Sequence, residues 1–107
     1  MVNKVNGLLG ITAKSGNIIS GTEVVLEAIS KKKVYLVIVA TDSSEKTIKN
    51  IKYFCDKENV EMIVYGNIFD NSKAIGKRNR AIIGICDINL ANKKKKEIHG
   101  GVEFGKN

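Results

Sequence analysis

The stretch Val34–Ala40 reads VYLVIVA and decides the fold class. It is an unbroken run of β-branched, aliphatic and aromatic residues without polar alternation, which is typical of a strand covered on both faces. Two similar runs follow it, Val60–Tyr65 and Arg80–Asp87. We therefore expect a sheet with Val34–Ala40 as its central strand and with helices on both sides.

Helical patterns fill most of the sequence before and between these runs. Apolar residues recur at helical spacing over Asn3–Ala13 and predict a first helix. Ser20-Gly21-Thr22-Glu23 matches a capping box, with serine at the cap and glutamate three residues later, and predicts a helix that ends at the cations Lys31–Lys33. The stretch Asp42–Glu45 also matches the pattern of a helix N-terminus, and it predicts a further helix that ends near Glu58.

The last third of the chain continues the alternation. A short helix is expected within Gly66–Gly76, with Ile68, Phe69 and Ile75 as its apolar anchors. Another short helix is expected to begin near Ile88 and to run into the lysine cluster at residues 93–96. Because helices alternate with buried strands, the sequence predicts the α/β class.

Length and charge limit the organisation and the partners. The chain has 107 residues, which fits one compact domain, and a net charge of +7, which favours a polyanionic partner. Residues 1–70 hold nine basic and eight acidic residues, whereas residues 71–107 hold nine basic and three acidic ones. We expect one domain over residues 1–92 and a basic, flexible tail over residues 93–107.

The sequence offers little catalytic chemistry. The one histidine, His99, lies in the weakly patterned tail, a poor place to orient a general base or a metal ligand. Cys55 and Cys86 are far apart and form no CxxC pair, so two buried free thiols are expected and no zinc or redox site. No run is apolar enough for a membrane span or a signal peptide. We expect a non-enzymatic, cytoplasmic protein without cofactor or metal.

Asp42 follows the central strand, where α/β proteins can place a functional carboxylate. Phosphoacceptor receiver domains are built in this way, but they also need an acidic pair after the first strand and a lysine after the last one. Because this sequence has neither, Asp42 is expected to be a helix N-cap.

Two segments can form a surface for a polyanion. The first, Ser20–Glu23, opens a helix, where free backbone N–H groups and the positive end of the dipole can hold a phosphate. The carboxylate of Glu23 either accepts hydrogen bonds from a guanine edge or serves the capping box alone, and spacing leaves both open. The second, Lys73–Arg80, has four cations and no acid. It is either a solvated loop or a phosphate contact, and its density of cations favours the contact.

The order of these motifs resembles the ribosomal protein L-seven-Ae and L-thirty-e superfamily, and most of all its small bacterial branch, the YlxQ-type proteins. In that family a Gly-Asn-Glu or Gly-Glu-Glu triplet opens the second helix, and Leu-Gly-Lys-Ala-x-Gly precedes a variable loop before the last strand. Gly21-Thr22-Glu23 and Ser72–Gly76 stand at these places here. The resemblance implies a three-layer α-β-α sandwich with a small mixed four-stranded sheet, in a protein that binds kink-turns in RNA.

The resemblance also implies roles for single residues. Glu23 would accept hydrogen bonds from guanine in the sheared G·A pairs of the kink-turn, and Gly21 would let the backbone approach. The loop before the last strand would pack on the bulged nucleotides, with Ile82 near its apolar floor. Leu26 and Ser44 stand where other members often carry lysine and an acidic residue. The implied RNA-binding set is Gly21, Thr22, Glu23, Ser44, Lys73, Lys77, Arg78, Asn79, Arg80 and Ile82.

The implied partner is structured RNA, either ribosomal RNA or an mRNA leader, and the implied state is a monomer that associates with the ribosome. One alternative is a module that docks on ribosomal proteins or on a translation factor without reading RNA. Another is the substrate-recognition part of an RNA methyltransferase, which would require a separate cofactor-binding domain.

Overall fold

The computed structural model describes residues 17–104 of the chain. The elements in chain order are β1 (Ile18–Ser20), α2 (Thr22–Ser30), β2 (Leu36–Val39), α3 (Glu45–Lys57), β3 (Glu61–Val64), α4 (Ile68–Ala74), β4 (Ile82–Ile85) and α5 (Ile88–Phe104). The helix predicted over Asn3–Ala13 lies outside the described residues.

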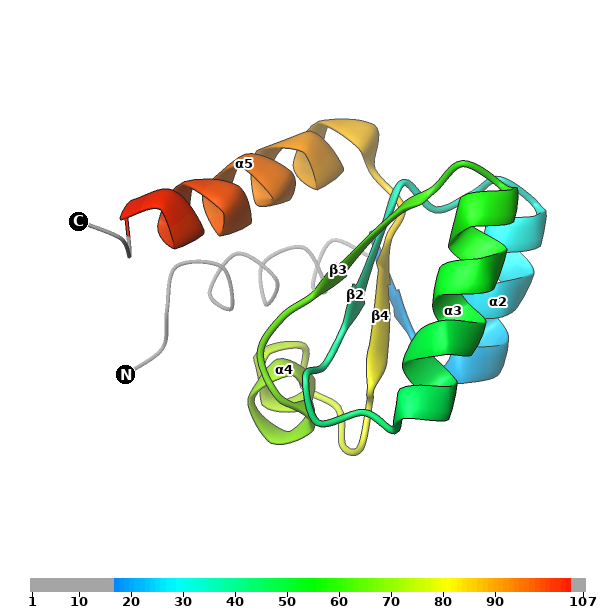
Figure 1. Ribbon diagram of the computed structural model, residues 1–107, viewed down its shortest axis with the longest axis horizontal. Coiled ribbons are helices and arrows are strands. Elements are labelled where there is room, and N and C mark those ends of the chain that lie inside the picture. The colour runs from blue at the N-terminus through cyan, green and yellow to red at the C-terminus, as the bar shows by residue number, and fades with distance from the viewer. Residues whose placement is uncertain (1–16, 105–107) are drawn as a thin grey trace.

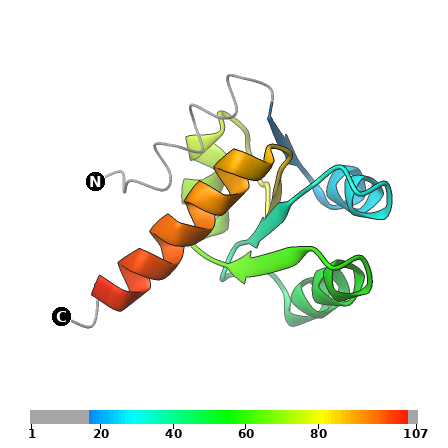
Figure 2. The same ribbon diagram turned by 90° about the horizontal axis from the view of Figure 1, so that it is seen from above.

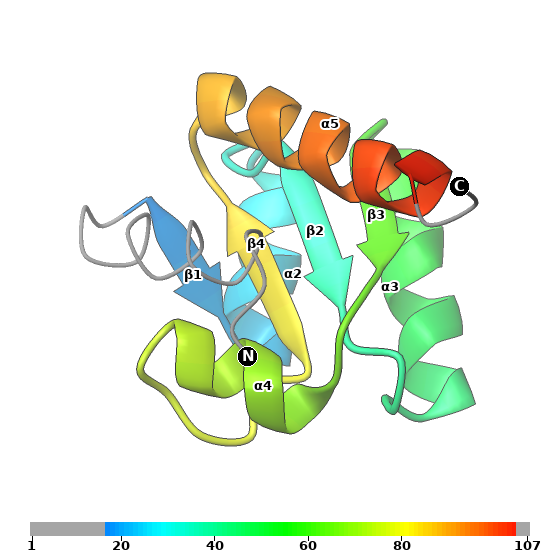
Figure 3. The same cartoon turned by 90° about the vertical axis from the view of Figure 1, so that its left-hand side faces the viewer.

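The four strands form one mixed sheet in the order β1-β4-β2-β3 (Figure 3). β2 and β3 are parallel, with Leu36 opposite Glu61, whereas β4 is antiparallel to both of its neighbours, β1 and β2. The strands β1, β2 and β3 therefore end at the same edge of the sheet, and β4 begins there. Because α4 lies along this edge, we call it the α4 edge (Figure 3).

Helices cover both faces of the sheet, α2 and α3 on one side and α4 and α5 on the other (Figures 1 and 2). Strand β2 divides its side chains between two cores. Val37 and Val39 pack with residues of α2 and α3, and Leu36 and Ile38 pack with residues of α4 and α5. All four are fully buried, which explains why the strand is apolar without alternation. The predicted three-layer α-β-α sandwich with a mixed four-stranded sheet is confirmed.

Asp42 does not cap the helix that follows it, contrary to expectation. The N-cap of α3 is Ser44, whose Oγ accepts a hydrogen bond from the backbone N–H of Thr47 at 3.1 Å. The Oδ1 of Asp42 accepts instead from the backbone N–H of Ile68 at 2.8 Å, at the start of α4. The carboxylate thus joins two neighbouring loops of the α4 edge, a long-range contact that spacing along the chain does not reveal.

Two expectations about burial are wrong. Strand β3 is an edge strand, so Glu61 and Val64 are exposed although the run reads as a fully covered strand. Phe69 is 73% exposed and does not anchor α4. The buried side of that short helix is formed by Asn71, Ser72 and the following Ile75, and Phe69 does not lie on it.

Helix α5 is longer than expected. It runs through Phe104 and includes the lysine run that was predicted to end it. Ile98 is buried and belongs to the same core as Ala91, seven residues earlier. Two apolar residues at this helical spacing hold the lysine-rich segment against the sheet, since a helix needs only a narrow apolar stripe to pack.

Candidate nucleic-acid interface

The structure brings the two predicted surface segments together at the α4 edge (Figure 3). The backbone N–H of Gly21, at the start of α2, donates to the carbonyl of Ile82 at 3.0 Å. The backbone N–H of Ala40, at the end of β2, donates to the carbonyl of Ala81 at 2.9 Å. Residues 75–81, which we call the α4–β4 loop, therefore end directly beside the start of α2.

Helix α2 begins without a capping side chain, so the predicted capping box at Ser20 is wrong. Its N-cap is Gly21, because a φ of +99° at this glycine turns the chain from strand into helix one residue later than expected. A Cβ at Gly21 would meet nothing within 4 Å, so a ligand can approach the backbone. Glu23 is exposed and, within residues 17–104, has no hydrogen bond or ion pair. The capping explanation for Glu23 no longer applies.

The α4 edge carries features that attract an anion, together with two exposed acids at the first turns of α2 and α3, Glu23 and Glu45. Helices α2 and α3 both begin there, so the positive ends of both helix dipoles are directed at it. The carboxylate of Asp42 is bonded to the start of α4, and that of Asp70 accepts a hydrogen bond from the side chain of Asn67 at 2.9 Å. Three exposed cations lie on α4 and the α4–β4 loop, namely Lys73, Lys77 and Arg78.

Ser72 holds the α4–β4 loop in place. It is 2% exposed, and its hydroxyl accepts a hydrogen bond from the backbone N–H of Arg80 at 2.7 Å and donates to the carbonyl of Arg80 at 3.3 Å. The carbonyl of Ser72 accepts from the backbone N–H of Lys77 at 2.8 Å. One buried residue thus fixes both ends of the exposed turn at residues 77–80. Sequence reasoning missed this role because it depends on a contact across the loop.

Ser72→Ala is expected to lower the free energy of unfolding by about 1 to 2 kcal/mol, because two backbone groups of Arg80 lose a largely buried partner. Urea denaturation measures the loss. Ser43→Ala is the matched control, since its buried Oγ has no hydrogen-bond partner within the described residues. Equal losses in the two variants would show that the loop does not depend on the Ser72 hydroxyl.

Three of the predicted site residues are wholly or partly buried, or are already hydrogen-bonded within the protein. Ile82 is fully buried in the core under α2 and α3, so it supports the loop from below and offers no surface. Arg80 is half-buried, and its Nε is buried without a hydrogen-bond partner in the part of the chain that the structure describes. The Ser44 hydroxyl is occupied by its capping bond and by a bond to the Thr47 Oγ1 at 2.8 Å.

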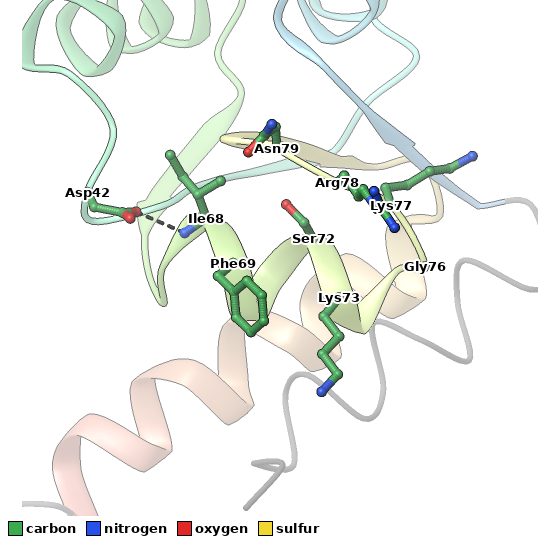
Figure 4. A pocket seen from close by; sticks show the side chains of 9 residues that line it. All are labelled: Asp42, Ile68, Phe69, Ser72, Lys73, Gly76, Lys77, Arg78 and Asn79. Atoms are coloured by element: carbon green, nitrogen blue, oxygen red, sulfur yellow. Dashed lines mark hydrogen bonds between the residues drawn. The ribbon is translucent and has the colours of Figure 1, made fainter.

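A pocket of about 780 Å³ lies between α4 and the α4–β4 loop (Figure 4). Its lining combines an aromatic ring, an aliphatic side chain and cations: Asp42, Ile68, Phe69, Ser72, Lys73, Gly76, Lys77, Arg78 and Asn79. Phe69 is the lining residue that sequence reasoning misplaced. A signal was present, because Phe69 stands four residues before Lys73 and so shares a face of α4 with a cation.

The described part of the chain adds no metal or thiol chemistry to this site. Residues 17–104 contain no group of three side chains that could hold a metal ion. Cys55 is fully buried, and burial raises the pKa of its thiol to about 11; Cys86 is half-buried, and burial also raises its pKa. Both thiols are free and protonated near neutral pH, which makes them poor nucleophiles. No helix in the described ranges has the length and apolar character needed to cross a membrane.

The fold is an α/β sandwich whose α4 edge carries the starts of α2 and α3 beside exposed cations. The chain belongs to the Ribosomal protein L7Ae/L30e/S12e/Gadd45 family, whose model matches residues 3–95. The resemblance stated from the motifs is thereby confirmed. Its YlxQ-type branch is confirmed by the relatives that follow.

The chain is 33% identical over 100 residues to RNA-binding protein YlxQ of Enterococcus faecium, covering 91% of this chain and 93% of the relative. It is 28% identical over 89 residues to RNA-binding protein YlxQ of Bacillus subtilis, covering 80% and 86%. A solved structure of a Bacillus halodurans protein of unknown function superposes with a TM-score of 0.83 at 32% identity, covering 86% of this chain and 93% of that one. The Giardia lamblia 15.5kD RNA binding protein, at 21% identity and a TM-score of 0.75, covers 92% and 84% and shares the fold.

Proposed function

We propose that this protein is a non-enzymatic RNA-binding protein that recognises kink-turn-like structured RNA. The start of α2 reads the sheared G·A pairs through Glu23, and the α4–β4 loop contacts the bulged nucleotides and the adjacent phosphates. The RNA belongs to the ribosome or to an mRNA leader, and the protein acts as a monomer in the cytoplasm. The relatives named as RNA-binding proteins support the class of partner.

The observation that carries the proposal is the position of the Glu23 carboxylate, which caps no helix and lies at the start of α2 beside the basic α4–β4 loop. Glu23 stands at a helix start with no partner in the described residues, and the bond from Gly21 to Ile82 keeps this helix start next to the α4–β4 loop. A carboxylate repels phosphates but accepts hydrogen bonds from the amino and imino groups of guanine. The combination therefore suits a partner with an accessible base edge as well as a charged backbone.

Gel-shift titration tests the proposal with a kink-turn duplex and a plain duplex of matched length and composition. We expect clear preference for the kink-turn at moderate salt. Equal affinity for the two RNAs would contradict specific recognition. Co-sedimentation with ribosomes that survives extensive nuclease treatment would favour the alternative, in which the protein docks on ribosomal proteins.

Arg78→Ala is expected to weaken RNA binding and to reduce the slope of log K against log salt by about 1, because a lost phosphate contact releases one counterion fewer. Fluorescence anisotropy at several salt concentrations measures both effects. Lys57→Ala is the control, since Lys57 is an exposed cation at the end of α3 that lies away from the α4 edge. If both variants changed the slope equally, Arg78 would make no specific phosphate contact and would only add to the overall positive charge of the protein.

A further inference from the structure

We propose that the outer face of α5 is a second RNA contact, which binds the backbone of a double-helical stem that flanks the kink-turn. The inference rests on the proposed function. It adds to that function a surface that lies apart from the α4 edge and that neither the start of α2 nor the α4–β4 loop provides.

The outer face of α5 is a continuous row of exposed polar side chains. Ala91 and Ile98 are buried in the core, so they mark the side of the helix that faces the sheet. The exposed residues on the other side are separated by three, one and three positions, which is the spacing of a single stripe along a helix. We call this row the α5 stripe, and it consists of Asn89, Asn92, Lys93 and Lys96.

The α5 stripe carries positive charge that no described side chain neutralises. Residues 88–96 of the helix include four lysines and no acid, and Glu97 follows them. The ammonium groups of Lys93 and Lys96 form no ion pair or hydrogen bond with any side chain that the structure describes. Both groups are therefore available to an anionic partner.

Two acids near α5 already have partners. Asp87, directly before the helix, accepts a hydrogen bond from the backbone N–H of Leu90 at 2.9 Å. Glu61 on β3 lies 3.6 Å from the ammonium group of Lys95, which is on a different side of the helix from Lys93. The ion pair joins α5 to the edge strand of the sheet and leaves the α5 stripe directed outward.

The chemistry of the α5 stripe favours an RNA backbone over a membrane or a protein. A helix that lies on a membrane needs an apolar face for the lipid, and Ile88 is the one exposed large apolar side chain among those that the structure describes on α5. Lysine is depleted from the cores of protein interfaces. Lysine and asparagine side chains both contact phosphates and sugars, and the 2′-hydroxyl groups of an RNA stem lie in its wide, shallow minor groove.

The position of α5 places the stripe on the path of the bound RNA. α5 lies on the same side of the sheet as α4 and crosses it away from the α4 edge (Figures 2 and 3). A stem that leaves the α4 edge over this side of the protein therefore passes α5. From Asn89 to Lys96 the stripe extends about 10 Å along the helix axis, which corresponds to roughly three steps of a duplex. It is long enough for several phosphates of one stem.

Lys93→Ala/Lys96→Ala tests the contact with kink-turn RNAs of different stem length. One RNA has minimal stems, and in two others one or the other stem is longer by a helical turn. We expect one of the longer RNAs to bind the unchanged protein more tightly than the minimal RNA does. The double variant should bind that RNA about tenfold more weakly, with a slope of log K against log salt reduced by about 2, because two phosphate contacts are lost. It should bind the minimal RNA normally.

Lys49→Ala/Lys57→Ala is the matched control. Both residues are exposed lysines of α3, across the sheet from α5, and their removal changes the net charge by the same amount. All four lysines are exposed, so both double variants should unfold at nearly the urea concentration of the unchanged protein. The control should keep the gain in affinity from the longer stem. Equal loss of that gain in the two variants would overturn the contact, because overall charge would then explain it.

Hydroxyl-radical footprinting gives a second readout, which does not depend on affinity. The unchanged protein should protect a short run of riboses in the longer stem. Lys93→Ala/Lys96→Ala should leave that run exposed and protect the kink-turn as before. Asn89→Ala/Asn92→Ala should weaken binding of the longer RNA without changing the salt slope, because a neutral amide releases no counterion.

The remaining outcomes separate this inference from the proposed function. A preference for kink-turns over plain duplexes, with no effect of stem length or of the α5 variant, would overturn the α5 contact and leave the proposed function intact. Equal binding of plain duplexes and kink-turns, both weakened by the α5 variant, would support the α5 contact and contradict kink-turn recognition. If the α5 variant lost only nuclease-resistant association with ribosomes, the α5 stripe would be a protein contact, and the inference would be wrong.

Discussion

Gly66→Ala is expected to lower the free energy of unfolding by about 2 to 5 kcal/mol, the sum of a backbone cost and a steric one. Gly66 has a φ of +69°, which an alanine adopts only with strain. A Cβ at this position would also lie 2.2 Å from the Oδ1 of Asn71. Urea denaturation measures the effect.

Neither partner of this clash can move freely. Asn71 is buried, and its Nδ2 donates a hydrogen bond to the carbonyl of Tyr65 at 2.8 Å. The carbonyl of Gly66 accepts from the backbone N–H and the hydroxyl of Thr41, at 2.8 and 2.6 Å. The substitution therefore disturbs the junction of the two loops that precede α3 and α4. RNA binding should fall with it at temperatures near the midpoint of unfolding.

Gly76→Ala separates the two contributions. Gly76 has the same φ of +69°, but a Cβ there would meet nothing within 4 Å. We expect this variant to lose only about 1 kcal/mol, the cost of the backbone conformation. Equal losses at Gly66 and Gly76 would show that the contact with Asn71 relaxes at no cost.

Glu23→Ala is expected to weaken binding of a kink-turn RNA by about 1 to 3 kcal/mol, the value of a good bidentate contact to a base. The sign of the effect is informative. Removing an acid makes this basic protein more positive by one charge, so a purely electrostatic interaction would become stronger. A loss of affinity for the kink-turn, with equal or better binding of a plain duplex, is the pattern that base recognition predicts.

Glu27→Ala is the matched control for this prediction. Glu27 lies one turn further along α2, is exposed, and forms an ion pair with Lys31 at 2.6 Å. Its removal changes the net charge as the substitution at Glu23 does, without touching the helix start. If the two variants bound the kink-turn equally, Glu23 would have no role in reading guanine.

Much of the fold could be predicted because a strand that is buried on both faces is apolar along nearly its whole length. Val34–Ala40 is apolar at every position but Tyr35, since its alternate side chains enter two different cores. The caps were less predictable. Ser20 and Asp42 both match N-cap preferences, yet Gly21 is the N-cap of α2 and Ser44 that of α3. The carboxylate of Asp42 bonds instead to Ile68 at the start of α4, far along the chain.

The two segments of the candidate site could be predicted from the sequence, but their position beside each other could not. The motifs around Glu23 and Arg78 identified two surface segments with the chemistry of an RNA contact. Ser72 and Phe69 were not recognised as site residues. Ser72 acts through hydrogen bonds to Arg80 across a loop, and Phe69 is exposed only because the neighbouring residues of α4 form the buried side of that helix.

The sequence by itself determined the layers, the class of partner and the family, because periodicity, net charge and the order of short motifs can be read along the chain without knowing which residues meet in space. Only the tertiary structure decided that the start of α2 lies beside the α4–β4 loop, that Glu23 caps nothing, and that Phe69 faces a pocket. These facts depend on strand order and on a few backbone hydrogen bonds, such as that from Gly21 to Ile82, between residues far apart in the chain. Contacts of that kind leave no periodic trace in the sequence.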